Sequence, residues 1–116
     1  MDVYHILCDL KEGASDTAFC DDVARYLGAL RDDGRLRGFR ITRRKLGLGP
    51  RELGEFHVAI EIDDLAQLER AFQSVSSRTD PIEELHARVN QVARNVLFAL
   101  YRDFPDARRR RGAERF

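Results

Sequence analysis

The chain has 116 residues, of which 43% are hydrophobic and 34% are charged, and this size and composition predict one packed domain rather than two. Twenty basic and twenty acidic side chains cancel, so the net charge gives no reason to expect binding to nucleic acid or to an anionic membrane surface. The longest unbroken apolar run, residues 96–101, is far too short to cross a bilayer.

The cysteines and the first residues indicate a cellular compartment. Cys8 and Cys20 have no metal-binding spacing and no Cys-x-x-Cys motif, and the first residues lack the pattern of a signal peptide. We therefore expect a cytoplasmic protein without a disulfide and without a bound metal, and the sequence leaves any cofactor unknown.

The first third of the chain predicts a strand followed by a helix. Residues 3–10 alternate as a strand that is apolar on one face and mixed on the other. Ser15 or Asp16 can cap a helix that ends at Gly34, where a left-handed backbone is favourable. The apolar positions of this helix recur at helical spacing. They are Phe19, Val23, Tyr26, Leu27 and Leu30.

Two further strands are predicted next. Residues 38–46 point Phe39 and Ile41 to one side and Arg40, Thr42 and Arg44 to the other. Glycines and a proline in residues 47–50 then break the pattern. Residues 55–62 alternate most cleanly. Phe56, Val58, Ile60 and Ile62 share one face, and His57, Ala59 and Glu61 share the other.

The remaining elements are two helices and a last strand. Asp64 and Gln67 form a capping-box pattern before a helix with an apolar stripe. That stripe consists of Leu65, Leu68, Phe72 and Val75. Asp80 and Pro81 predict the start of a second helix.

Residues 95–103 are consistent with either a continuing helix or a strand; we favour a strand, because their apolar residues are continuous. Residues 105–116 predict a disordered basic tail, with four arginines in a row at 108–111.

This order of elements predicts an α+β fold over residues 1–104. It is the ferredoxin-like split β-α-β sandwich with one helix inserted before the last strand. Only one face of such a sheet is covered by helices of the same chain. The other face would expose apolar residues of the first and last strands, such as Leu7 and Leu97, and we expect a homodimer that packs sheet on sheet.

Three phrases of the sequence support a resemblance to a known group. They are residues 42–47 (TRRKLG), 54–57 (GEFH) and 99–106 (ALYRDFPD). With the element order, they resemble an uncharacterised bacterial family within the dimeric α+β barrel superfamily. The resemblance implies a fold and a dimer, in which two sheets pair as a barrel. It transfers no catalytic residue, because the catalytic residues of these proteins differ.

Candidate catalytic residues lie on the mixed faces of the first and third strands. His5 and Asp9 alternate on one, and His57 and Glu61 alternate on the other. If position 5 lies opposite 61, position 9 lies opposite 57, which gives two histidine–carboxylate pairs suited to general base work. The alternative is that they are ordinary polar groups on a half-exposed sheet or at a dimer contact.

Candidate ligand-binding residues are Arg40, Arg44 and Tyr101. The two arginines can bind a carboxylate or a phosphate, or they can protect an edge strand from unwanted pairing. Tyr101 can line a cavity or simply pack. We expect a small-molecule binding protein or enzyme with a cavity between sheet and helices near His5, His57 and Arg40. The alternative is a non-catalytic dimeric interaction or regulatory module.

Overall fold

The computed structural model describes residues 1–78 and 80–105. Four strands and three helices follow one another along this part of the chain. They are β1 (Asp2–Leu10), α1 (Asp16–Asp32), β2 (Gly38–Arg43), β3 (Phe56–Ile62), α2 (Leu65–Ser76), α3 (Ile82–Val92) and β4 (Ala93–Arg102). This is the predicted α+β ferredoxin-like fold with one helix inserted before the last strand. The predicted basic tail lies outside the described residues, apart from its first position.

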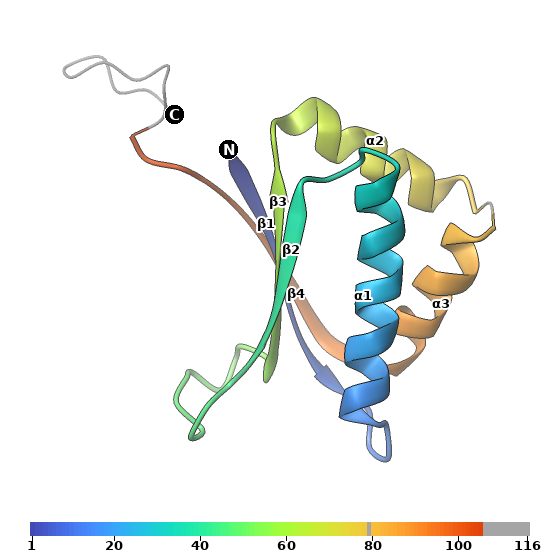
Figure 1. Cartoon of the computed structure of the whole chain (residues 1–116). Helices are drawn as coiled ribbons and strands as arrows, with labels where there is room; N and C mark the ends of the chain where they lie inside the picture. The colour runs from blue at the N-terminus through green and yellow to red at the C-terminus, as the bar shows by residue number, and fades with distance from the viewer. Residues whose placement is uncertain (79, 106–116) are drawn as a thin grey trace.

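The four strands form one antiparallel sheet in the order β2-β3-β1-β4. All three helices lie on the same side of this sheet (Figure 1). We call that side of the sheet the covered face and the opposite side the open face. Within the described residues, no helix is long and apolar enough to span a membrane.

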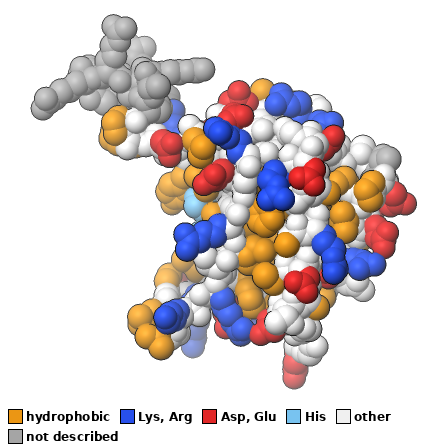
Figure 2. All heavy atoms as spheres, in the orientation of Figure 1, with side chains coloured by type: hydrophobic (Ala, Val, Ile, Leu, Met, Phe, Trp, Pro, Cys, Tyr) orange, Lys and Arg blue, Asp and Glu red, His pale blue; other side chains and the backbone are white. Residues whose placement is uncertain are grey.

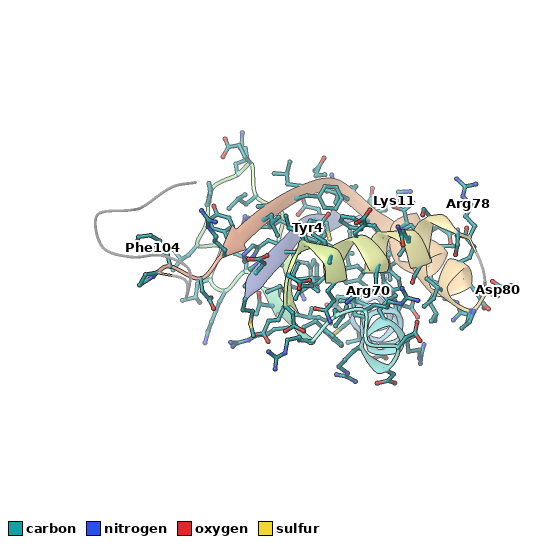
Figure 3. The ribbon with its side chains drawn as sticks, turned by 90° about the horizontal axis from the view of Figure 1, so that it is seen from above. Tyr4, Lys11, Arg70, Arg78, Asp80 and Phe104 are labelled. Carbon is teal, nitrogen blue, oxygen red and sulfur yellow. The ribbon has the colours of Figure 1, made fainter. Side chains whose placement is uncertain are left out.

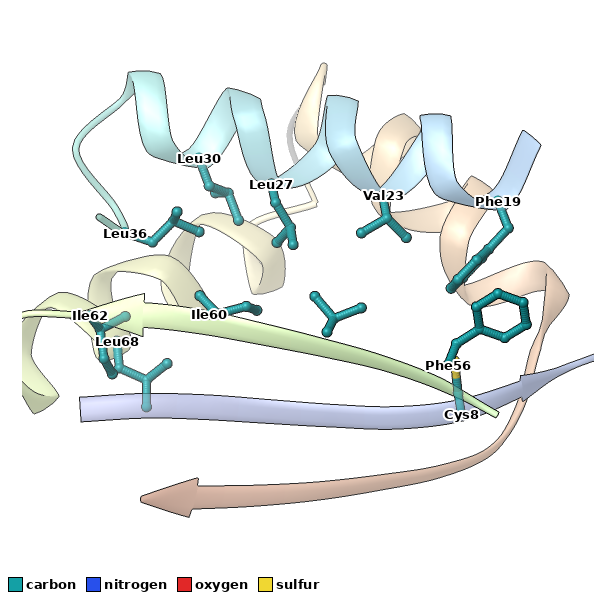
Figure 4. Close-up of a cluster of buried hydrophobic side chains, with 11 residues drawn as sticks. Cys8, Phe19, Val23, Leu27, Leu30, Leu36, Phe56, Ile60, Ile62 and Leu68 are labelled. Carbon is teal, nitrogen blue, oxygen red and sulfur yellow. The ribbon is translucent and has the colours of Figure 1, made fainter. Parts of the chain in front are cut away.

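The core lies between α1 and the covered face (Figure 4). The predicted apolar stripe of α1 is confirmed, because Phe19, Val23, Leu27 and Leu30 are all buried. Ser15 caps this helix as predicted, its side chain accepting a hydrogen bond from the backbone N–H of Ala18. The covered-face residues of β3 are buried against the stripe, as the alternation predicts. They are Phe56, Val58, Ile60 and Ile62.

Helix α2 keeps only part of its predicted stripe: Leu68 is buried and Phe72 contacts Tyr4 of β1, whereas Leu65 points outward. Leu65 and Phe72 are 62% and 49% exposed, whereas Gln67 and Ala71 are buried with Leu68. The side chain of Gln67 accepts a hydrogen bond from the backbone N–H of Asp63 and donates one to the carbonyl of Gly34. These bonds satisfy the buried amide and hold this side of α2 inward.

The last helix and strand differ in detail from the prediction. Pro81 is itself the residue before α3, and no side chain caps this helix, so the predicted capping role of Asp80 is wrong. Residues 95–103 are largely strand, as favoured, but β4 begins directly at Ala93. Its register against β1 shifts between Leu7 and Asp9, and Asn95 there has a φ of 52°, a combination typical of a β-bulge.

Strand β2 is shorter than predicted. It ends at Arg43 rather than at residue 46, because Leu46 and Gly47 adopt φ angles of 57° and 65° that a strand does not allow. Arg44 therefore lies beyond the strand, and it does not share a strand face with Arg40.

The register of β1 against β3 also corrects the prediction. His5 lies opposite Ala59, and Leu7 lies opposite His57. The strands are thus displaced by two residues from the predicted pairing of position 5 with 61. The faces remain as predicted, because side chains alternate with a period of two. The partners across the strands are different.

Candidate cavity and open-face histidine pair

A cavity of about 350 Å³ lies between the covered face and the helices. Its volume falls in the range of small-molecule sites, roughly 300–1,000 Å³. The walls are mainly apolar side chains of the sheet and of all three helices, among them Ile6, Val23, Ala71 and Val89. Hydrophobic side chains are also visible between the sheet and the helices in Figure 2. Such a lining favours an uncharged, largely apolar molecule.

Two phenols contribute polar groups to this cavity. Tyr4 comes from β1, and Tyr26 comes from α1. Burial, together with the nearby Tyr4, raises the pKa of Tyr26 to about 12, and burial also raises the pKa of Tyr4. Both hydroxyls are therefore protonated at neutral pH and available as hydrogen-bond donors.

The ring of Tyr4 is fixed by aromatic neighbours. It meets Phe72 edge to face with ring centres 5.6 Å apart, and it lies parallel to Phe98 at 5.9 Å. Figure 3 shows Tyr4 between β1 and α2. Aromatic pairs of this kind orient a ring, so the phenol of Tyr4 is held in place at the wall of the cavity.

Helix α3 supplies the other polar groups. His86 and Asn90 line the cavity one helical turn apart. The His86 ring lies 5.5 Å from the ring of Tyr26. An imidazole, an amide and two phenols therefore border an otherwise apolar space. This arrangement can orient a molecule by hydrogen bonds while burying its apolar part.

Cys8 also lines the cavity, but it is not a candidate nucleophile. Burial and the nearby Asp9 raise the pKa of its thiol to about 11, and a thiol attacks as its thiolate. Cys8 therefore acts as a small buried apolar residue.

The predicted catalytic histidines lie on the other side of the sheet. His5 Nδ1 and His57 Nε2 are 2.8 Å apart on the open face. The two ring planes differ by only 22°, and the ring centres are 5.0 Å apart. That separation is nearly the largest that a 2.8 Å nitrogen contact allows, so the rings meet edge to edge in a hydrogen bond. One nitrogen must donate and the other must accept.

The surroundings of His57 favour its neutral form. Burial, and then the proximity of His5, lowers the pKa of His57. Tyr101 meets the His5 ring edge to face with ring centres 5.2 Å apart. Because the bond between the two imidazoles needs an acceptor nitrogen, it is lost when both rings are protonated.

Asp9 does not pair with His57, so that prediction is wrong. Its carboxylate accepts hydrogen bonds from the backbone N–H of Glu55 and from the side chain of Asn95. These bonds lower the pKa of Asp9, the bond from Glu55 contributing most. The two-residue shift in register places Asp9 beyond His57. Through its two hydrogen bonds Asp9 instead connects the end of β1 to the starts of β3 and β4.

The other predicted residues are dispersed. Arg40 and Glu61 are exposed on the open face, and Tyr101 lies there too, 66% exposed. Arg44 is folded back onto its own loop, where it donates hydrogen bonds to the carbonyls of Pro50 and Leu53. None of these residues lines the cavity between sheet and helices, so the predicted position of that cavity near His5, His57 and Arg40 is wrong.

Tyr4, Tyr26 and Asn90 were missed as candidate site residues. The first two occupy apolar positions of β1 and α1, where a tyrosine resembles an ordinary core residue. The sequence did contain a signal for the two tyrosines, since a buried phenol needs a partner for its hydroxyl.

Within residues 1–78 and 80–105, no group of three histidine, cysteine or acidic side chains is arranged to hold a metal ion.

The sheet and its one-sided helix layer define the class of protein. Four antiparallel strands with all helices on one face form a ferredoxin-like fold, as the resemblance implied. Over residues 1–116, the chain belongs to a family described as "Family of unknown function (DUF6614)". No curated protein matches it.

Solved structures share the fold at low sequence identity. A cofactor-independent oxygenase, SnoaB from Streptomyces nogalater, is similar with a TM-score of 0.69 and 7% identity, over 93% of this chain and 97% of that one. A dabb family protein from Mesorhizobium loti is similar with a TM-score of 0.64 and 17% identity, over 89% of this chain and 96% of that one. A dimeric ferredoxin-like protein of unknown function from Jannaschia is similar with a TM-score of 0.65 and 13% identity, over 89% of this chain and 100% of that one.

Proposed function

We propose that this protein is a homodimer that binds a small, largely apolar ring compound in the cavity between its sheet and helices, as a binding protein or an enzyme. The observation that carries the proposal is the apolar cavity of about 350 Å³ with a few polar groups on its wall. The fold shared with an oxygenase is consistent with a reaction at such a site.

The polar groups suggest how the molecule is oriented. Tyr26 keeps its proton to about pH 12, so it donates to an acceptor such as a carbonyl or hydroxyl oxygen. Among the residues that the structure describes, no lysine or arginine lines the cavity. A carboxylate ligand would therefore lose its hydration without gaining a cationic partner, which is costly. We expect neutral compounds to bind more tightly than their anionic analogues.

The test uses a fluorescent ring compound. The chain has no tryptophan, so 2-naphthol fluorescence excited beyond the tyrosine band reports binding directly, and 2-naphthoate serves as the anionic analogue. We expect saturable binding of naphthol, and binding of naphthoate weaker by about tenfold or more. Binding of neither compound, or tighter binding of the anion, would contradict the proposed cavity site.

A matched pair of variants locates the binding. Ala71→Phe places a ring in the cavity wall on α2, whereas Ala66→Phe adds the same ring on the exposed side of that helix. We expect the first variant to weaken naphthol binding by about tenfold or more and the second to leave it unchanged. Equal effects would exclude the cavity as the binding site.

The homodimer is proposed through the open face. That face carries Leu7, Leu97 and Tyr101, of which the last two are 44% and 66% exposed. Apolar side chains gathered on one face of a small domain favour a partner surface. Two proteins with the same fold are described as dimeric. We expect the contact to bury more than about 1,200 Å² in total.

Sedimentation equilibrium tests the dimer. We expect a dimer at micromolar concentration, and we expect Leu97→Asp to give a folded monomer. Leu65→Asp, which changes a leucine 62% exposed on the outer side of α2, is the control and should remain dimeric. A monomeric wild-type protein would contradict the proposed dimer. A dimer that binds no ring compound would instead favour the alternative of a non-catalytic interaction module.

A further inference from the structure

The cavity between the sheet and the helices opens to solvent where α2, α3 and β4 border it. Of the described residues that line the cavity, four are exposed, and the others are buried or half-buried. The exposed ones are Phe72 and Ser76 of α2, Asn90 of α3 and Phe98 of β4. A residue that lines a cavity and is itself exposed marks the place where the cavity meets the solvent. We therefore refer to these four residues as the rim, and to the opening that they border as the mouth.

The two phenylalanine rings of the rim have defined positions. Phe98 is 62% exposed and Phe72 is 49% exposed. The ring of Tyr4 lies parallel to the ring of Phe98, with centres 5.9 Å apart, and meets the ring of Phe72 edge to face at 5.6 Å. Because the same neighbour holds both rings, the aromatic part of the rim is organised before a ligand binds, which lowers the entropy cost of binding.

The rings of the rim leave apolar surface in water beside the cavity. Phe19 and Phe56, by contrast, meet in the core with ring centres 5.3 Å apart and are only 2% and 5% exposed. At the rim, a bound molecule can supply the contact that the core supplies for those two rings, and covering this surface favours binding. The other two residues of the rim are a serine and an asparagine, so an apolar ligand does not have to desolvate a charge there.

We propose that the ligand enters the cavity through this mouth and carries an aromatic ring that packs against Phe98 and Phe72 in the bound state. This inference rests on the proposed binding function and adds two specificity-determining residues to it. Aromatic rings attract one another through their quadrupoles, beyond the apolar area that they bury. A saturated ring buries a similar area without this attraction, so the rim selects aromatic ligands over their saturated analogues.

The first experiment compares 2-naphthol with decahydro-2-naphthol, which has the same carbon skeleton and hydroxyl group but no aromatic ring. Naphthol binding is followed by its fluorescence, and the saturated analogue is measured by displacement of naphthol. We expect the wild-type protein to bind naphthol more tightly. In Phe98→Leu, which keeps an apolar side chain and removes the ring, the preference for naphthol should fall by about two- to tenfold. Phe72→Leu should lower this preference in the same direction.

The matched control for these variants is Phe104→Leu, because Phe104 is 74% exposed and does not line the cavity. The preference for naphthol should be unchanged in this variant. An unchanged preference in both rim variants, or an equal fall in the control, would overturn the aromatic contact at the mouth while the proposed binding function stands. Failure of the wild-type protein to bind naphthol would overturn the two together.

The second experiment locates the ligand by cysteine labelling in a Cys20→Ser background. Phe98→Cys is compared with Leu100→Cys, which changes a residue 48% exposed on the same face of β4 that does not line the cavity. Cys8 does not compete for the reagent, because it is buried and the pKa of its thiol is raised to about 11. With naphthol at about ten times the dissociation constant of each variant, labelling at position 98 should slow by about tenfold, and labelling at position 100 should be unchanged. Equal slowing at both positions, or none at position 98, would overturn the proposed site at the mouth.

Discussion

The two faces of the sheet are made from the same strands, yet they serve different purposes. Along β3, the residues on the covered face are at most 6% exposed. Their neighbours on the open face, His57 and Ala59, are half-buried, and Glu61 is exposed. One residue of displacement along the strand thus separates a packed core from a surface that holds a histidine pair.

The comparison separates stability from recognition within one sheet. The chain's own helices supply the apolar surface for the covered face, and a cavity remains between them and the sheet, lined on α2 by residues such as Ala71. Within residues 1–78 and 80–105 no helix covers the open face, and we expect a second copy of the chain to supply its contacts. Changes on the covered face should therefore alter folding, whereas changes on the open face should alter association and pH dependence.

The largest expected difference between the two faces is the loss of unfolding free energy caused by substitutions at two neighbouring positions of β3. Ile62 has no exposed surface, and Ile62→Ala should lower the free energy of unfolding by about 2–5 kcal/mol, because it removes buried methyl groups and leaves a void. Glu61→Ala on the open face should change it by less than about 0.5 kcal/mol. Urea denaturation of both variants measures the contrast, and similar losses would contradict it.

A second prediction concerns the close contact between Gly54, just before β3, and the backbone of Cys8 in β1. A Cβ at Gly54 would lie 2.3 Å from the carbonyl carbon of Cys8, so Gly54→Ala forces β1 and the end of the β2–β3 loop apart. We expect a loss of about 1–3 kcal/mol in unfolding free energy.

Gly28→Ala is the matched control for that substitution. Gly28 lies within α1, where the nearest atom to an added Cβ is 3.8 Å away. The same change should stabilise the protein there by up to about 1 kcal/mol, because alanine favours a helix. Loss of stability in both variants would show that the close approach at Gly54 is not the cause.

Much of the fold follows from periodicity in the sequence. The alternation of β1, β3 and β4 predicts which residues share a face, and the stripe of α1 predicts its buried side. The register does not follow from it. A slip of one residue would turn apolar side chains toward water, but a slip of two leaves every face intact. His5 could therefore be assigned to the correct face and still be paired with the wrong partner.

The cavity was harder to predict for a different reason. On α2, the inward side carries Ala71 and Gln67 as well as Leu68, and the side chain of Gln67 is hydrogen-bonded to backbone groups at Asp63 and Gly34. A hydrophobic stripe cannot indicate contacts of a buried amide. Leu65, which the stripe places inward, is instead exposed.

The third prediction returns to the open face. His57→Ala removes the 2.8 Å hydrogen bond to His5, and we expect a loss of about 0.5–1.5 kcal/mol in unfolding free energy. His57→Gln, which keeps a donor and an acceptor, should lose less. Naphthol binding in the cavity should be unchanged in both variants, because the pair lies across the sheet from it. A loss of binding without loss of stability would indicate that the two faces communicate.

The smallest expected effect is a pH dependence that belongs to the open face. The pKa of His57 is lowered in the folded protein by burial and by His5, whereas in the unfolded chain it returns to its ordinary value of about 6.5. Between these two values the unfolded state binds more protons, so stability is fully present above about pH 6.5 and falls as the pH is lowered through this window. Asp9, whose pKa is lowered from 3.8, contributes its own loss of stability only in stronger acid.

Urea midpoints between pH 5 and 7.5 should therefore decline toward acid in the wild-type protein and decline less in His57→Gln. An NMR titration should place the midpoint of His57 below 6.5. An identical slope in the two proteins, or a midpoint above 6.5, would contradict the burial of a neutral His57 on this face.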